Sequence, residues 1–114
     1  MAPRFLVAAA LTLASILPVS AQSCKSVDAD LADFEGAGGS DHEFLTGEER
    51  ARAVAIYNAT PPQSDESFDI VFIGRLPNGV GVVAYGKGGE ICIRAAMPAG
   101  VFARFIETIR GRAI

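Results

Sequence analysis

The chain has 114 residues, of which 50% are hydrophobic and 20% are charged, and its formal net charge is −3 at pH 7. This length fits one small domain. The acidic balance argues against a nucleic-acid partner, because neutralising phosphates needs clustered Lys and Arg side chains. We therefore expect a single small domain that binds no nucleic acid.

Residues 1–21 are organised like a secretory signal peptide. Arg4 supplies a positive charge, residues 5–17 form an apolar run of 13 residues, and small residues ending at Ala21 suit a signal peptidase. An uncleaved membrane anchor is the alternative, but the run is shorter than the roughly 17–25 residues that span a bilayer. The sequence predicts a cleaved signal peptide, a mature domain over 22–114 with no stable membrane insertion, and a periplasmic or secreted location.

Both cysteines, Cys24 and Cys92, lie in the predicted mature chain. An even number of cysteines in an exported chain indicates a disulfide. Two free thiols, zinc binding and intermolecular pairing are the alternatives, and a lipid-anchored Cys24 is a further one, although Ala21-Gln22-Ser23 suits that processing poorly. We predict a disulfide between Cys24 and Cys92.

In the first half of the mature chain, two helices flank a short extended segment. Residues 25–35 suit a helix capped by Ser26, with Val27, Leu31 and Phe34 on one face. Residues 42–45 suit the extended segment. The second helix begins at Thr46, where a glutamate three residues later forms a capping-box pattern, and ends near Asn58, a residue type that tolerates a left-handed C-cap.

The second half of the mature chain has the pattern of a β-meander followed by a helix. Residues 68–75 are apolar on both faces at their centre, as in an interior strand. Two further strands, 80–85 and 90–96, follow glycine-containing turns at 76–79 and 86–89. In the third strand, simple alternation places Ile91 and Ile93 on one face and Cys92 on the other. Residues 98–110 form the last helix, with an apolar side made by Val101, Phe102, Phe105, Ile106 and Ile109.

These elements predict an α+β fold. It contains a three-stranded antiparallel β-meander, with room for one extra short strand, packed against two or three helices on one side. The segment 22–49 carries eight carboxylates against Lys25, whereas 50–114 is net basic, so we expect the acidic part to pair with the basic C-terminal helix.

His42, the single histidine, is flanked by Asp41 and Glu43, with Ser40 nearby. Neighbouring residues of an extended segment point to opposite faces, so these side chains cannot form a serine triad by themselves. A weak metal site on His42, Asp41 and Glu43 remains an alternative, although zinc prefers more nitrogen or sulfur ligands. The simplest interpretation is an exposed histidine in a polar segment.

Other motifs point to structure. Asp28, Asp30 and Asp33 resemble the start of a calcium loop, but the required glycine and glutamate are missing. The segment 86–89 lacks the pattern of a phosphate-binding loop and suits a hairpin turn. No catalytic or cofactor motif is recognised, so we expect no cofactor.

The sequence therefore favours a non-enzymatic binding or interaction protein with one disulfide, whose partner is a protein or a small ligand. Tyr57, Phe68 and Tyr85 are the candidate binding residues, as aromatic side chains that the helices would leave uncovered. Two alternatives stay open: a hydrolase-like enzyme or metal-binding protein using His42 with nearby carboxylates, and a structural protein of the cell envelope.

Overall fold

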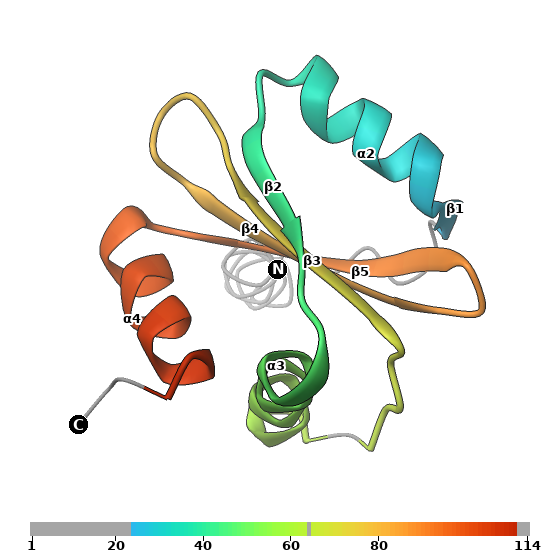
Figure 1. Cartoon of the computed structure of the whole chain (residues 1–114), viewed down its shortest axis with the longest axis vertical. Helices are drawn as coiled ribbons and strands as arrows, with labels where there is room; N and C mark the ends of the chain where they lie inside the picture. The colour runs from blue at the N-terminus through green and yellow to red at the C-terminus, as the bar shows by residue number, and fades with distance from the viewer. Residues whose placement is uncertain (1–23, 64, 112–114) are drawn as a thin grey trace, which may run out of the picture.

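The computed structural model describes residues 24–63 and 65–111 (Figure 1). The predicted signal peptide, 1–21, lies outside the described residues. In chain order the elements are β1 (Lys25–Ser26), α2 (Val27–Gly36), β2 (Ser40–Phe44), α3 (Gly47–Ala59), β3 (Ile70–Arg75), β4 (Gly81–Lys87), β5 (Glu90–Met97) and α4 (Ala99–Ile109). Within these ranges, no helix has both the length and the apolar content needed to cross a bilayer.

The five strands form one curled antiparallel sheet in the order β1-β5-β4-β3-β2. The predicted meander is the centre of this sheet, because β3, β4 and β5 are joined by tight turns. Gly79, Gly88 and Gly89 adopt positive φ values in those turns, as the predicted hairpin chemistry requires. The strands β1 and β2 extend the meander at its two edges, so the sheet is larger than the sequence predicts.

The helices lie on both faces of the sheet, which corrects the prediction that they share one side. In Figure 1, α2 lies on the opposite side of the strands from α3 and α4. The two faces carry separate hydrophobic clusters. The reason lies in β3, whose successive residues Val71 and Phe72 are both fully buried, because each faces a different layer of helices.

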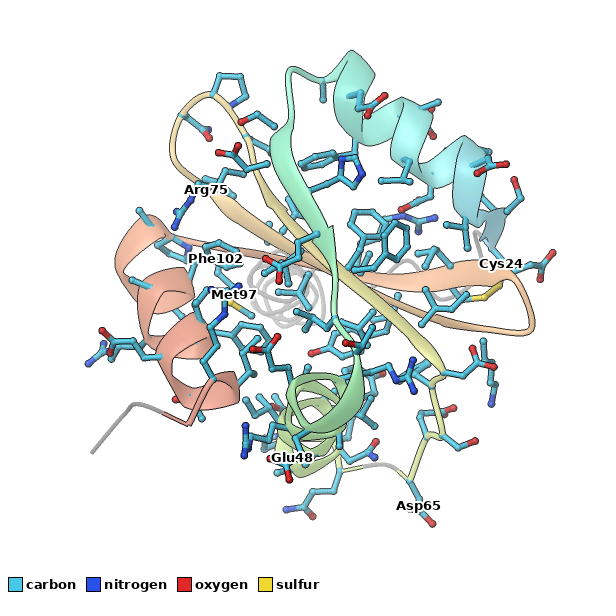
Figure 2. The ribbon with its side chains drawn as sticks, in the orientation of Figure 1. Cys24, Glu48, Asp65, Arg75, Met97 and Phe102 are labelled. Atoms are coloured by element: carbon cyan, nitrogen blue, oxygen red, sulfur yellow. A yellow bond between two sulfur atoms is a disulfide. The ribbon has the colours of Figure 1, made fainter. Side chains whose placement is uncertain are left out.

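The larger cluster fills the space between the sheet and the pair α3 and α4. Its buried members are Leu45, Ala53, Val71, Ile73, Val83, Tyr85, Ile93, Phe102, Phe105 and Ile109. Phe102 lies directly over Gly81, where a Cβ atom would come within 1.9 Å of the ring. The guanidinium of Arg75 lies 4.9 Å from the centroid of the same ring (Figure 2). Gly81 therefore makes room for the aromatic side chain that attaches α4 to the sheet.

The predicted disulfide between Cys24 and Cys92 is present and joins the start of the chain to β5 (Figure 2). Cys92 is the extra residue of a β-bulge, because the consecutive residues Tyr85 and Gly86 of β4 pair with Ile93 and Ile91. As a result Ile91 joins the cluster under α2, whereas Ile93 joins the cluster under α3 and α4. The prediction that Ile91 and Ile93 share a face is therefore wrong.

Three local predictions about the helices also need correction. Thr46 occupies the N-cap position of α3, but its side chain makes no capping hydrogen bond. Asn58 does not cap the C-terminus of α3; its side chain bonds both backbone groups of Glu66 at 3.0 Å. Val101 is 46% exposed, because the buried side of α4 is narrower than its apolar sequence suggests. The cap of α2 is as predicted, since the Ser26 hydroxyl accepts a hydrogen bond from the Ala29 N–H at 3.2 Å.

The disulfide closes a loop across 68 positions of the chain, so we expect it to stabilise the fold by up to about 4 kcal/mol in the chain-entropy model. Urea titration with and without reductant measures this difference, and intact mass should show the oxidised chain to be lighter by two hydrogens. The Cys24→Ser/Cys92→Ser double variant is the control and should match the reduced chain. Alkylation of both cysteines without reductant would contradict the assignment.

Candidate functional site

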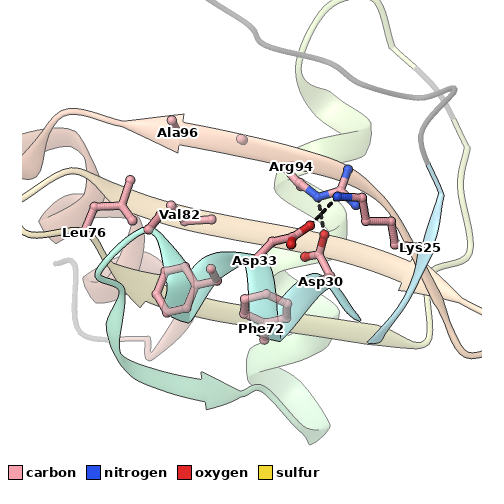
Figure 3. Close-up of a pocket in the computed structure, with 11 residues that line it drawn as sticks. Lys25, Asp30, Asp33, Phe72, Leu76, Val82, Arg94 and Ala96 are labelled. Carbon is pink, nitrogen blue, oxygen red and sulfur yellow. Dashed lines mark hydrogen bonds and ion pairs between the residues drawn. The ribbon is translucent and has the colours of Figure 1, made fainter. Parts of the chain in front are cut away.

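A cavity of about 530 Å³ lies between α2 and the sheet (Figure 3). Its walls come from β1, α2, β3, β4, β5 and the segments that follow α2 and β3. The lining residues are Lys25, Asp30, Asp33, Phe34, Ala37, Phe72, Leu76, Val82, Arg94, Ala95 and Ala96. Most of these side chains are apolar, and the charged ones gather at the end where β1 lies (Figure 3). The site is therefore an apolar hollow with an ionic end.

Phe34 sets how α2 lies on the sheet. Its ring occupies the space over two glycines, since a Cβ atom at Gly39 or Gly74 would come within 2.4 Å of the ring. The ring also meets Phe72 edge-on, with centroids 6.0 Å apart. The Phe34 side chain thus anchors the C-terminal half of α2, because the two glycines leave space for its ring.

Two ion pairs connect α2 to the strands at the charged end of the cavity. Asp30 accepts a hydrogen bond from Arg94 Nε, and Asp33 accepts one from Lys25 Nζ (Figure 3). The first pair is largely withdrawn from water, because the Asp30 side chain is only 5% exposed. The second is open to solvent, and the hydrogen bond and charge of Lys25 lower the pKa of the Asp33 carboxyl. At this end of the cavity, the charges of the two carboxylates and the two cations therefore neutralise one another.

A second cavity, of about 240 Å³, lies on the opposite face of the sheet, between α3 and β5. It is lined by Ile56, Tyr57, Thr60, Pro61, Pro62, Tyr85, Ile93, Arg94, Ala95 and Met97. Two of the three aromatic residues proposed from the sequence as binding residues, Tyr57 and Tyr85, are in this set. The third, Phe68, lines a neighbouring cavity of about 190 Å³ beside the disulfide.

Tyr57, Phe68 and Tyr85 pack together, with ring centroids 5.1 to 5.2 Å apart. Tyr85 is 2% exposed, and its hydroxyl donates a hydrogen bond to the Ala53 carbonyl at 3.1 Å. Burial raises the pKa of the Tyr85 phenol, so it stays a neutral donor at physiological pH. Tyr85 thus holds α3 to the sheet, and Tyr57 and Phe68 retain partly exposed faces.

The structure separates His42 from the two carboxylates that flank it in sequence. His42 lies on β2 with its ring edge-on to Phe44, and its Nδ1 atom is 3.8 Å from a Glu35 carboxylate oxygen. Asp41 and Glu43 instead line a small cavity of about 180 Å³ against α4. The alternation of side chains along β2 accounts for this division.

The acidic segment and the C-terminal helix are paired, as the sequence predicts. Arg110 Nη2 donates a hydrogen bond to Glu43 at 2.8 Å, and Arg110 Nε lies 3.8 Å from a Glu49 oxygen. Across the described ranges, the single cluster of three ligand-type residues is Cys24, Glu90 and Cys92. Its two sulfur atoms are joined in the disulfide, so they are not thiolate ligands.

Sequence reasoning missed the pairing of Asp30 with Arg94. A signal for Asp30 was present, because position 30 lies on the same helical stripe as Val27, Leu31 and Phe34 and is therefore directed toward the sheet. A carboxylate on that stripe needs a buried cation or donor. Nothing in the alternation of β5 identifies Arg94 as that cation, because the bulge at Cys92 changes which residues face α2.

No family model, curated protein or solved structure matches this chain.

Because the two ion pairs differ in exposure to solvent, we expect removal of the negative charge from each to change the free energy of unfolding by different amounts. Asp30→Asn should lower the free energy of unfolding by about 2 kcal/mol, because it weakens a charge-assisted bond to a guanidinium held largely out of water. Asp33→Asn, the same change one turn along the helix, should leave stability nearly unchanged because solvent screens that pair. Urea titration of both variants measures the contrast, and equal losses would refute it.

Proposed function

We propose that this chain is an exported, disulfide-stabilised binding protein without catalytic activity, and that its ligand site is the cavity under α2. The size and composition of that cavity carry the proposal. A hollow of about 530 Å³, with Phe34, Phe72, Leu76 and Val82 in its walls, falls within the range of ligand sites.

The charges in the wall indicate which ligands suit this site. Arg94 is paired with Asp30 and Lys25 is paired with Asp33, so the wall holds cations and carboxylates in equal number. A ligand would therefore gain most by covering the apolar surface, with its polar groups directed to the ionic end. An apolar side chain of a partner protein, or a small molecule of similar character, has this chemistry.

The alternatives from the sequence receive less support. Catalysis or metal binding by His42 requires the neighbouring carboxylates to converge with it, whereas Asp41 and Glu43 line the cavity beside α4 and His42 contacts Phe44. Among the described residues, no specific contact favours a structural role in the cell envelope.

Export is part of the proposal and rests on the N-terminal sequence together with the disulfide, since structural disulfides persist in oxidising compartments. We expect the chain, expressed in an export-competent host, to be recovered outside the cytoplasm with Gln22 as its first residue. N-terminal sequencing and intact mass test this. Recovery of the unprocessed chain from the cytosol with both cysteines reduced would contradict it.

The cavity is tested by filling it. Val82→Phe adds an aromatic ring to the wall under α2, so we expect it to weaken binding of the apolar dye anilinonaphthalenesulfonate at least about tenfold. Val101→Phe, the same change at the exposed position on α4, is the matched control and should leave dye affinity unchanged. A fluorescence titration of the oxidised protein measures both. Absence of dye binding to the native chain, or equal effects of the two variants, would overturn the assignment of the site.

A further inference from the structure

The cavity beside α3 has a buried floor and an exposed rim. Tyr85 and Ile93 in its wall are only 2% and 8% exposed, whereas Thr60, Pro61 and Pro62, which follow α3, are exposed. The cavity therefore opens to solvent at the C-terminal end of α3 and reaches down to the core of the domain.

The one charged residue in the lining of this cavity directs its charge elsewhere. Arg94 belongs to the lining set, but its guanidinium is bonded to Asp30 on the opposite face of the sheet. A charged ligand would therefore lose its hydration in the cavity without gaining an ionic partner, which is costly. The cavity suits an uncharged molecule.

Three hydroxyl groups belong to the lining residues, and two of them are bonded to backbone carbonyls of α3. Tyr85 donates to the Ala53 carbonyl at 3.1 Å, and Thr60 donates to the Ile56 carbonyl at 2.8 Å. The Tyr57 hydroxyl makes no hydrogen bond with any residue that the structure describes. A phenol O–H donates one hydrogen bond, so a ligand with an acceptor atom satisfies this group.

The volume and the side chains of the cavity indicate an aromatic ligand. An apolar cavity of roughly 150 Å³ holds benzene, so about 240 Å³ leaves room for a larger ring system. Tyr57 and Tyr85 contribute rings whose centroids are 5.1 Å apart, and Met97 contributes a thioether. Both kinds of group make favourable contacts with an aromatic ring. A flat molecule of two fused rings fits this combination.

From these observations we propose that the cavity beside α3 binds a small, uncharged heteroaromatic molecule whose ring acceptor takes a hydrogen bond from the Tyr57 hydroxyl. The side chains of Phe and Trp carry no such acceptor, which favours a free molecule over these residues of a partner protein. The site lies on the opposite face of the sheet from the cavity under α2. The inference therefore does not depend on the proposed function.

The first test uses ring compounds of similar shape on the native, oxidised chain. Quinoline is uncharged at neutral pH and has one ring nitrogen as an acceptor, whereas N-methylquinolinium carries a permanent charge. We expect saturable binding of quinoline, with shifts of the Tyr57, Tyr85 and Ile93 amides in an NMR titration. N-methylquinolinium should bind at least about tenfold more weakly. Absence of quinoline binding, or equal binding of the two compounds, would overturn the proposal.

The hydrogen bond is tested by Tyr57→Phe, which removes the hydroxyl and keeps the ring. Quinoline affinity should fall roughly three- to tenfold, the usual net effect of losing one hydrogen bond. Naphthalene has the same shape without an acceptor, so its affinity should stay unchanged. Equal effects of the substitution on quinoline and naphthalene would refute the assigned role of Tyr57.

Two neighbouring alanines of β5 give a matched test of the location. Ala95 pairs with Val83 of the core that faces α3, whereas Ala96 pairs with Val82, which packs under α2. Ala95→Phe should therefore fill the cavity beside α3 and lower quinoline affinity at least about tenfold, and Ala96→Phe should leave it unchanged. The amide NMR spectrum is the folding check, and the Tyr57→Phe comparison decides independently if Ala95→Phe does not fold. Equal effects of the two alanine substitutions would contradict the location.

The remaining outcomes identify other sites or occupants. Quinoline binding that Val82→Phe weakens and Ala95→Phe does not would place quinoline under α2. Concentration-dependent shifts of the same amides without quinoline would assign the cavity to an interface between copies of the chain. Either result overturns the proposal. Quinoline binding that persists in a chain that does not bind the anilinonaphthalenesulfonate dye would support this site while refuting the proposed one under α2.

Discussion

The attachment of α2 to β5 is the constraint on which the cavity depends. The helix is fixed to β5 at its start by the disulfide and the β1 pairing, and near its middle by Asp30 and Arg94. Its end is held on β3 instead, where the Phe34 ring lies over Gly74 and beside Gly39. Between these attachments the helix does not close onto β4 and the end of β5, and the apolar surface of the sheet remains accessible there. The contacts that stabilise α2 on this face of the sheet therefore also determine where the cavity under the helix lies.

Much of the architecture could be predicted because it is determined locally. Turn glycines, the Ser26 cap and the apolar stripes of the helices each depend on a few neighbouring residues, so the central meander and the three helices could be located from sequence. The disulfide was predicted from the even cysteine count together with the predicted signal peptide. For the candidate site, the role of Tyr57, Phe68 and Tyr85 in binding stays a prediction, and Tyr85 is buried in the core at 2% exposure, not left uncovered as expected. The larger cavity under α2 was not anticipated.

The missed features depend on contacts between distant segments. The two residues of β1 are too short to carry a periodic pattern, and their strand geometry comes from pairing with β5. The bulge at Cys92 reverses the facing of the residues before it, which local alternation does not reveal. The placement of α2 on the opposite face from the other helices follows from β3, whose apolar character on both sides is visible in sequence but does not specify which helix covers which side.

The two layers of helices are unequal in the apolar surface that they bury. Among the residues that the structure describes, the layer under α2 has four buried core residues, Phe34, Phe72, Ala84 and Ile91, against ten in the layer that α3 and α4 complete. Cooperative units with less buried apolar surface open at lower free energy than the rest of a fold. Release of α2 as a unit should thus precede global unfolding, and the thinner layer is the part of the domain in which ligand entry requires the least structural reorganisation.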